Sequence, residues 1–209
     1  LALLGEGTVP ALIENVGKQM GMPVGPLAVN DEVGLDLSYK VAQQTKKDLG
    51  DAYKGGPGES VIETMNELGR FGRKNAKGFY VYPEGGGKKF LWPELSATVA
   101  GGLAADQPSP AEVKERLLYR QLVECARCMG EGVLETPQDG DLGAIFGWGF
   151  APFTGGPFSH MDTVGIANVV ATLDRLAQKH GERFAPPQLL RDMAARGDSF
   201  YAMAAKKAA

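Results

Sequence analysis

The stretch that decides the fold is Gly5-Glu6-Gly7, Met22-Pro23-Val24-Gly25-Pro26 and Val33-Gly34. A second copy of the same framework reads Gly130-Glu131-Gly132, Ala151-Pro152-Phe153-Thr154-Gly155-Gly156-Pro157 and Val164-Gly165. In both copies the last proline lies eight positions before the last glycine, and a further glycine follows sixteen positions later. Matched spacing of this kind indicates an internal repeat. The sequence therefore predicts two tandem copies of one helical unit.

Composition places the chain among soluble globular proteins, because 44% of its 209 residues are hydrophobic and 22% are charged. The formal net charge of -3 offers no broad basic surface, so we expect no nucleic-acid partner. No apolar run approaches the roughly 18–20 residues of a membrane span. Two cysteines make no disulfide framework. We expect a cytoplasmic or organelle-matrix protein, and the lack of a peroxisomal signal at 205–209 favours the bacterial cytoplasm.

Apolar residues recur at helical spacing along most of the chain, most clearly in Gly165–His180. Ser109-Pro110-Ala111-Glu112 is a capping box with proline at the first helical position, and it predicts a helix of about twenty residues. Over Gly34–Leu49 the pattern places Leu37 and Val41 on the inward face. These segments together predict an all-α protein.

The domain limits follow from the glycine- and proline-rich segment 83–108, which has the composition of a linker. We expect a first helical domain over 1–82 and a second over 109–209. In the repeat, Leu1–Leu4 corresponds to Ala126–Met129, the end of a long helix whose earlier part has no counterpart in the first copy. The first domain is therefore expected to be truncated at its N-terminus, within a fragment of a longer polypeptide.

Motifs for nucleotide binding and nucleophilic catalysis are missing from the sequence. No G-x-G-x-x-G follows a strand, and there is no P-loop and no G-x-S-x-G elbow. Cys125 and Cys128 form a C-x-x-C inside a helix, where a core role is favoured over a metal or redox role. We therefore expect no catalytic, cofactor-binding or metal site in this chain.

Several other residues have both a structural and a functional interpretation. His180 suits a helix C-terminus, whereas His160 lies near the repeated glycine–proline turn. Trp148 and Phe150 lie among glycines, a pattern that is more typical of aromatic residues that anchor a loop on the core than of a binding surface. The densest basic cluster could meet phosphates, although a solvated face is favoured; its members are Arg70, Arg73, Lys74 and Lys77.

The first half resembles the C-terminal domain of 3-hydroxyacyl-CoA dehydrogenases in Met22–Pro26, Asp31–Asp36 and Gly69–Tyr80. The second half looks like the tandem extra copy of that domain in Glu131-Gly132-Val133, Gly149–Pro157 and Glu182–Pro187. One departure is Ala76, where relatives commonly carry glycine, and it leaves the local loop conformation open. The resemblance covers essentially the whole chain.

The resemblance implies the helical fold of 6-phosphogluconate dehydrogenase C-terminal domains, in two tandem copies and with no Rossmann domain in this chain. Two copies imply the multifunctional fatty-acid β-oxidation α subunit, in which a hydratase domain and an NAD-binding Rossmann domain lie upstream. NAD and the catalytic His–Glu pair then belong to that Rossmann domain, so no cofactor is expected here. The implied partners are acyl-CoA, the upstream domains and a thiolase subunit.

By resemblance, the parent enzyme oxidises an L-3-hydroxyacyl-CoA with NAD, and the helical domains close the acyl-CoA cleft and supply dimer or interdomain surfaces. The candidate substrate-facing residues are Met22, Pro23, Gly25 and Pro26. The alternative is a turn that only orients two helices, within a purely structural assembly module. A third class, a self-sufficient helical enzyme, would need a catalytic constellation that the sequence does not contain.

Overall fold

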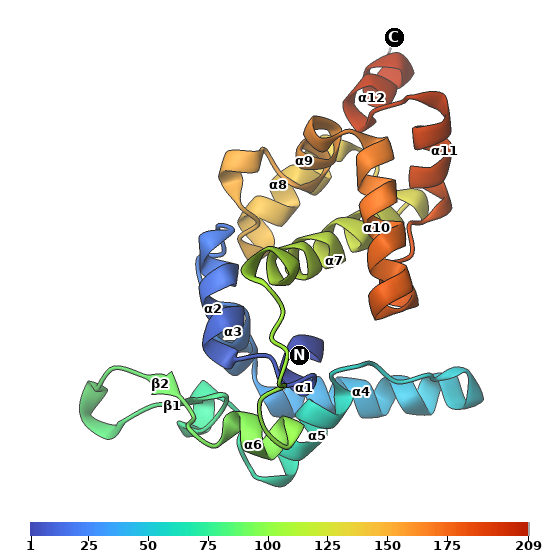
Figure 1. Cartoon of the computed structure of the whole chain (residues 1–209). Coiled ribbons are helices and arrows are strands. Elements are labelled where there is room, and N and C mark those ends of the chain that lie inside the picture. The colour runs from blue at the N-terminus through green and yellow to red at the C-terminus, as the bar shows by residue number, and fades with distance from the viewer. Residues whose placement is uncertain (209) are drawn as a thin grey trace. The chain divides into compact units, whose positions relative to one another are not determined.

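The computed structural model describes the backbone of residues 1–208 and the side chains of residues 1–205. Its contacts divide the chain into two compact units. The first unit contains Leu1–Gln19 and Pro23–Val113, and the second contains Met20–Met22 and the chain from Lys114 onward. Both units are built almost entirely from helices (Figure 1), which confirms the all-α prediction.

The first unit combines helices with short 3₁₀ turns and one small antiparallel sheet, in which Tyr80 pairs with Leu91. Its elements are α1 Ala2–Gly5, α2 Pro10–Gln19, α3 Pro26–Val33, α4 Leu35–Leu49, η1 Gly50–Ala52, α5 Glu59–Glu67, η2 Arg73–Asn75, β1 Tyr80–Val81, η3 Glu84–Gly86, β2 Phe90–Leu91 and α6 Leu95–Ala100. Several apolar side chains of these elements are fully buried, among them Ile13, Leu27, Leu35, Met65 and Phe79. Burial of such side chains is the main favourable term in folding.

Helix α4 differs from its predicted packing. Leu35 is fully buried at its start, but Leu37 and Val41 are 50% and 57% exposed. The prediction that these two residues face inward is therefore wrong. The reason is that α4 packs on α5 and α3 along one side, whereas Leu37 and Val41, four positions apart, share a face of the helix that these neighbours do not cover.

Segment 83–108 carries structure of its own in the form of η3, β2 and α6. Leu95 is 1% exposed, and α6 packs against α1 and α5. The Arg70 guanidinium lies 3.9 Å from the ring centroid of Trp92, a cation–π contact that also holds this segment to the first unit. By contact, the first unit continues to Val113, beyond the predicted linker.

Helix α7 begins within the first unit and belongs to the second unit from Lys114 onward. At its start the N–H of Glu112 donates to Ser109 Oγ at 3.2 Å, so the predicted cap is confirmed. The elements are α7 Pro110–Gly130, α8 Pro137–Trp148, η4 Pro152–Thr154, α9 Pro157–Val164, α10 Ile166–His180, η5 Glu182–Phe184, α11 Gln188–Arg196 and α12 Phe200–Ala208. The core runs along one face of α7 and α10 and includes Leu122, Phe158, Met161, Leu173 and Leu176. Helix α12 was not predicted; Phe200 at its start is buried and stacks edge-on against Phe158 at 4.8 Å.

Candidate functional site

The turn proposed to face substrate, Met22–Pro26, leads directly into α3. Pro26 occupies the first helical position, where its missing N–H leaves no bond unmade. Gly25 has an ordinary φ of -65°, so backbone conformation does not require glycine there. A Cβ at Gly25 would overlap the carboxylate of Glu14, and this close approach does require glycine.

Glu14 reaches this turn from α2 and is only 3% exposed. Its Oε1 accepts the N–H groups of Leu27 and Ala28, the second at 3.3 Å, and its Oε2 accepts the Tyr80 hydroxyl at 2.7 Å. The carboxylate thus satisfies first-turn donors of α3 and lies at the positive end of the helix dipole. Burial, followed by the hydrogen bond to Glu14, raises the pKa of Tyr80, so this hydroxyl keeps its proton at neutral pH.

Asp31, at the other end of α3, is 1% exposed and makes a similar set of bonds. Its Oδ1 accepts the Phe79 N–H at 2.8 Å, and its Oδ2 accepts the Tyr80 N–H at 2.9 Å and the Tyr82 hydroxyl at 3.1 Å. Burial raises the pKa of Asp31, and these hydrogen bonds oppose the rise. Tyr80 is therefore tied through its backbone to Asp31 and through its hydroxyl to Glu14.

The second unit repeats this arrangement around α9. Asp141 on α8 is 3% exposed. It accepts the Phe158 N–H at 2.7 Å, the Ser159 N–H at 3.1 Å, the Ser159 hydroxyl at 2.6 Å and the Tyr201 hydroxyl at 2.8 Å. Both carboxylate oxygens are therefore occupied by donors from α9 and α12.

Asp162, near the end of α9, completes the arrangement by accepting the Phe200 N–H at 2.8 Å and the Tyr201 N–H at 3.0 Å. Tyr201 thus joins two carboxylates, as Tyr80 does in the first unit. We refer to these sets as the first clamp (Glu14, Asp31, Tyr80) and the second clamp (Asp141, Asp162, Tyr201). In each clamp an internal carboxylate occupies the N-terminus of a helix, so that helix end is used for folding.

The sequence analysis missed both clamps, although a signal was present. An aspartate follows the last proline of the repeated turn by five positions in both copies, as Asp31 and Asp162. A Phe-Tyr pair occurs late in both copies, at Tyr80 and Tyr201. These matches would have named four of the six clamp residues.

A cavity of about 70 Å³ lies within the second unit. Its lining is Met20, Met22, Lys114, Leu118, Gln121, Phe150, Ala151, Phe153, Thr154 and His160. Of the four candidate substrate-facing residues, the structure places Met22 in this lining and leaves Pro23, Gly25 and Pro26 outside it. The walls are mostly apolar, with an ammonium and an imidazole among a few polar groups, a composition typical of small-molecule sites.

His160 and Lys114 are the two basic side chains of this cavity. Neither side chain has a hydrogen-bond or ion-pair partner among the described residues. Burial, and to a lesser degree the Lys114 ammonium, lowers the pKa of His160 below that of a free imidazole. At neutral pH the imidazole of His160 is therefore mostly uncharged.

We expect His160 to titrate below the ordinary imidazole pKa of about 6.5. The unfolded chain then binds more protons than the folded chain in the window between the two pKa values. The contribution of His160 to folding stability therefore decreases as the pH falls through that window. Proton NMR of the imidazole Hε1 signals measures the pKa, and His160→Asn distinguishes it from His180. Lys114→Met should raise the pKa of His160; a pKa above about 6.5 in the unsubstituted chain would contradict the expectation.

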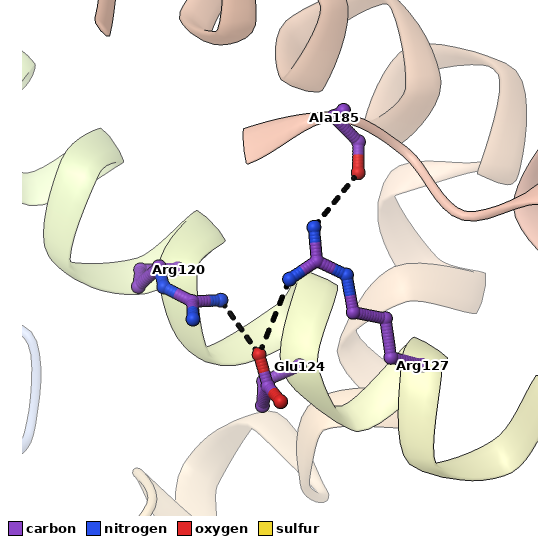
Figure 2. Close-up of polar contacts among 4 residues, drawn as sticks. All are labelled: Arg120, Glu124, Arg127 and Ala185. Atoms are coloured by element: carbon purple, nitrogen blue, oxygen red, sulfur yellow. Dashed lines mark hydrogen bonds and ion pairs between the residues drawn. The ribbon is translucent and has the colours of Figure 1, made fainter. Parts of the chain in front are cut away.

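Helix α7 also carries a charged row on its outer surface, which Figure 2 shows. Glu124 Oε2 accepts from Arg120 Nη1 at 2.8 Å and from Arg127 Nη1 at 3.5 Å. Arg127 Nη2 donates to the Ala185 carbonyl at 3.4 Å, which links α7 to the segment that precedes α11. The row is partly exposed, and such pairs each contribute about 0–1 kcal/mol, so it adds little to the stability of the unit.

The basic cluster of the first unit is largely engaged in internal contacts. Arg70 donates to the Gly78 carbonyl at 2.9 Å, and Arg73 pairs with Glu32 at 2.9 Å. Lys74 pairs with Asp36. Three of the four side chains of the cluster therefore have partners within the protein.

The remaining candidates lie mainly in the core of the second unit. Cys125 is buried as a free thiol, and burial raises its pKa to about 12, so it is not a thiolate at neutral pH. Phe150 is buried, whereas Trp148 is 53% exposed and donates to Gln121 at 3.2 Å. Among the described side chains no group of three potential metal ligands comes together, and no helix of the described chain is long and apolar enough to cross a membrane.

Comparison with known proteins finds one matching family model and similar proteins that share one name. Residues 1–82 match the family described as "3-hydroxyacyl-CoA dehydrogenase, C-terminal domain". The "Fatty acid oxidation complex subunit alpha" of Shewanella amazonensis is 40% identical over 199 residues, which are 95% of this chain and 28% of that protein. The protein of the same name from Shewanella frigidimarina is likewise 40% identical over 199 residues, with the same coverage. The chain therefore spans just over a quarter of the length of these relatives.

Two solved structures share the fold at low sequence identity. The 3-hydroxybutyryl-CoA dehydrogenase of Escherichia coli superposes with a TM-score of 0.68 at 18% identity, over 94% of this chain and 56% of that chain. The dehydrogenase part of multifunctional enzyme 1 from C. elegans gives a TM-score of 0.62 at 20% identity, over 91% and 43%. These likenesses confirm the helical fold.

Proposed function

Because residues 1–82 belong to the 3-hydroxyacyl-CoA dehydrogenase C-terminal domain family and the whole chain is related to fatty acid oxidation complex α subunits, we propose that it is the helical part of such an enzyme. The parent enzyme oxidises an L-3-hydroxyacyl-CoA to the 3-oxoacyl-CoA with NAD. A Rossmann domain outside this chain holds NAD. The identity of 40% over 95% of the chain carries this proposal.

We further propose that the two halves are tandem copies of one helical domain, over 1–82 and 109–209, joined by the segment 83–108. The two clamps support this, since the same types of residue make the same bonds around α3 and α9. A carboxylate at the helix N-terminus, a second carboxylate within the helix and a tyrosine that joins them form a pattern of three positions in each unit. Two unrelated helical units are not expected to share it.

The proposed role of this chain is to supply part of the acyl-CoA cleft and the surfaces that join it to the upstream Rossmann and hydratase domains. Met22 is its proposed substrate-facing side chain, with Pro23, Gly25 and Pro26 shaping the turn that presents it. The side chain of Met22 is half-buried, and a flexible thioether suits contact with an acyl chain. A thiolase subunit as partner and a bacterial cytoplasmic location complete the proposal.

The alternative is a purely structural helical module without substrate contact. The observation that favours it is that Glu14 and Asp141 occupy the N-termini of α3 and α9 from within the protein. Those helix ends are then unavailable to the phosphates of an incoming ligand. The two functions differ in whether Met22 touches substrate.

A chimera tests the proposal, in which this chain replaces the 199 aligned residues of the Shewanella amazonensis α subunit. We expect it to keep NADH oxidation with acetoacetyl-CoA, whereas the subunit with those residues deleted should lose it. A folded chimera without turnover would refute the assignment. In an active chimera, Met22→Trp should raise KM several-fold with little change in melting temperature if Met22 lines the cleft. An unchanged KM would favour the structural module.

A further inference from the structure

The cavity of the second unit has features that the proposed function does not use. Apolar side chains make up most of its wall, including Leu118 on α7 and Phe150, which is 3% exposed. Lys114 and His160 lie in the same lining, and none of the ten lining residues, all within the described part of the chain, carries a carboxylate. The ammonium is therefore not neutralised by the cavity itself.

Lys114 is an exposed residue and His160 is half-buried, so an anion at the mouth of the cavity could reach both side chains. Elsewhere in the second unit the cations do pair, as Arg175 does with Glu115 at 2.9 Å and Arg191 with Asp174 at 2.7 Å. Lys114 and His160 have no such partner among the described residues. An anion in the cavity would be a partner for both side chains, because the ammonium of Lys114 would attract its charge and the imidazole N–H of His160 would donate a hydrogen bond to it.

We propose that this cavity binds an alkyl carboxylate, whose head group meets Lys114 and His160 and whose chain lies on the apolar wall. The volume of about 70 Å³ accepts the head group and the first carbons. Phe153, 77% exposed at the same cavity, offers apolar surface to a longer chain. This site requires neither NAD nor a Rossmann domain, and the proposal does not rest on the dehydrogenase assignment.

The chemistry of the site sets its selectivity. A neutral alcohol of equal length would keep the apolar contacts but lose the charge-assisted bonds, which are roughly twice as strong as neutral ones. Coenzyme A would offer phosphates without the alkyl chain. A carboxylate should therefore bind better than either, and its binding should depend on Lys114.

Isothermal titration of the purified chain with octanoate tests the proposal, with octan-1-ol and coenzyme A as comparison ligands. We expect octanoate to bind at one site and Lys114→Met to weaken its binding about tenfold or more. The matched control is Lys54→Met, because Lys54 is an exposed lysine of the first unit outside the cavity. The affinity of this variant for octanoate should equal that of the unsubstituted chain. Circular dichroism melting verifies that both variants fold.

Proton NMR locates the site, because the chain contains only two histidines. Octanoate should shift the ring signals of His160 and leave those of His180 in place. The proposal would be overturned if octan-1-ol bound as tightly as octanoate, or if both lysine variants lost affinity equally. It would also be overturned if coenzyme A displaced octanoate, or if octanoate shifted only the signals of His180. Absence of octanoate binding to the folded chain would overturn it as well, without affecting the chimera experiment.

Discussion

Asp141→Asn should lower the free energy of unfolding of this chain by about 2–4 kcal/mol, because hydrogen bonds to a buried charge are each worth about 1.5–3 kcal/mol. Asp141 is 3% exposed and accepts four hydrogen bonds from α9 and α12. The asparagine side chain has the shape of the aspartate, but an NH₂ donor group replaces one of the two acceptor oxygens. That donor group would face the N–H or O–H donors that now bind the carboxylate. At least one donor at the start of α9 then has no acceptor. Urea unfolding followed by circular dichroism measures the change.

The matched control is Asp174→Asn, which makes the same chemical change at an exposed aspartate of the same unit. Asp174 pairs with Arg191 at 2.7 Å with both side chains well exposed, and such pairs contribute about 0–1 kcal/mol. Tyr201→Phe tests the clamp separately, since it removes the donor at 2.8 Å from Asp141 and leaves the ring in place. Equal losses for Asp141→Asn and Asp174→Asn would show that the second clamp does not stabilise the unit.

Local signals are what made the fold predictable from sequence. Ser109 and Pro110 define the start of α7, and Pro137 that of α8, through capping chemistry that depends on neighbouring residues only. Gly165 and Gly181 flank α10, both with positive φ. Such features act within a few residues, so they can be identified before the partners of each helix are known.

The clamps could not be derived in the same way, because their bonds connect distant parts of the chain. Glu14 and Tyr80 are 66 positions apart, and Asp141 and Tyr201 are 60 apart. A glutamate within a helix normally indicates a solvated face, and only the tertiary fold shows that it is buried. The same reason applies to Leu37 and Val41, because only the tertiary fold shows which face of α4 its neighbours cover.

The cavity was only partly predictable. Met22 and His160 were singled out for their position near the repeated turn, and both line it. Lys114 and Leu118 come from α7, and nothing in their sequence spacing indicates that they lie beside His160. Gly25, in contrast, was predicted as a substrate-facing residue, and the structure gives it a packing role against Glu14.

Gly25→Ala should therefore be strongly destabilising, by about 2–4 kcal/mol, as expected for overpacking combined with loss of buried hydrogen bonds. The added methyl would occupy the space of the Glu14 carboxylate. Glu14 would have to move away, which would release the N–H groups of Leu27 and Ala28 and the Tyr80 hydroxyl. Urea unfolding of the isolated chain measures this loss without any substrate.

The matched control is Gly56→Ala in the same unit, where no atom lies within 4 Å of the added methyl and φ lies outside the left-handed region. Its stability should stay unchanged or rise by up to about 1 kcal/mol, because alanine restricts the unfolded chain. Glu14→Gln combined with Gly25→Ala should lose less than the sum of the two single changes, since both disrupt the first clamp. If the losses of unfolding free energy were additive, or if Gly25→Ala were as stable as Gly56→Ala, the Glu14 carboxylate would not be held against this turn. The substrate-facing role of Gly25 would then be favoured over its packing role.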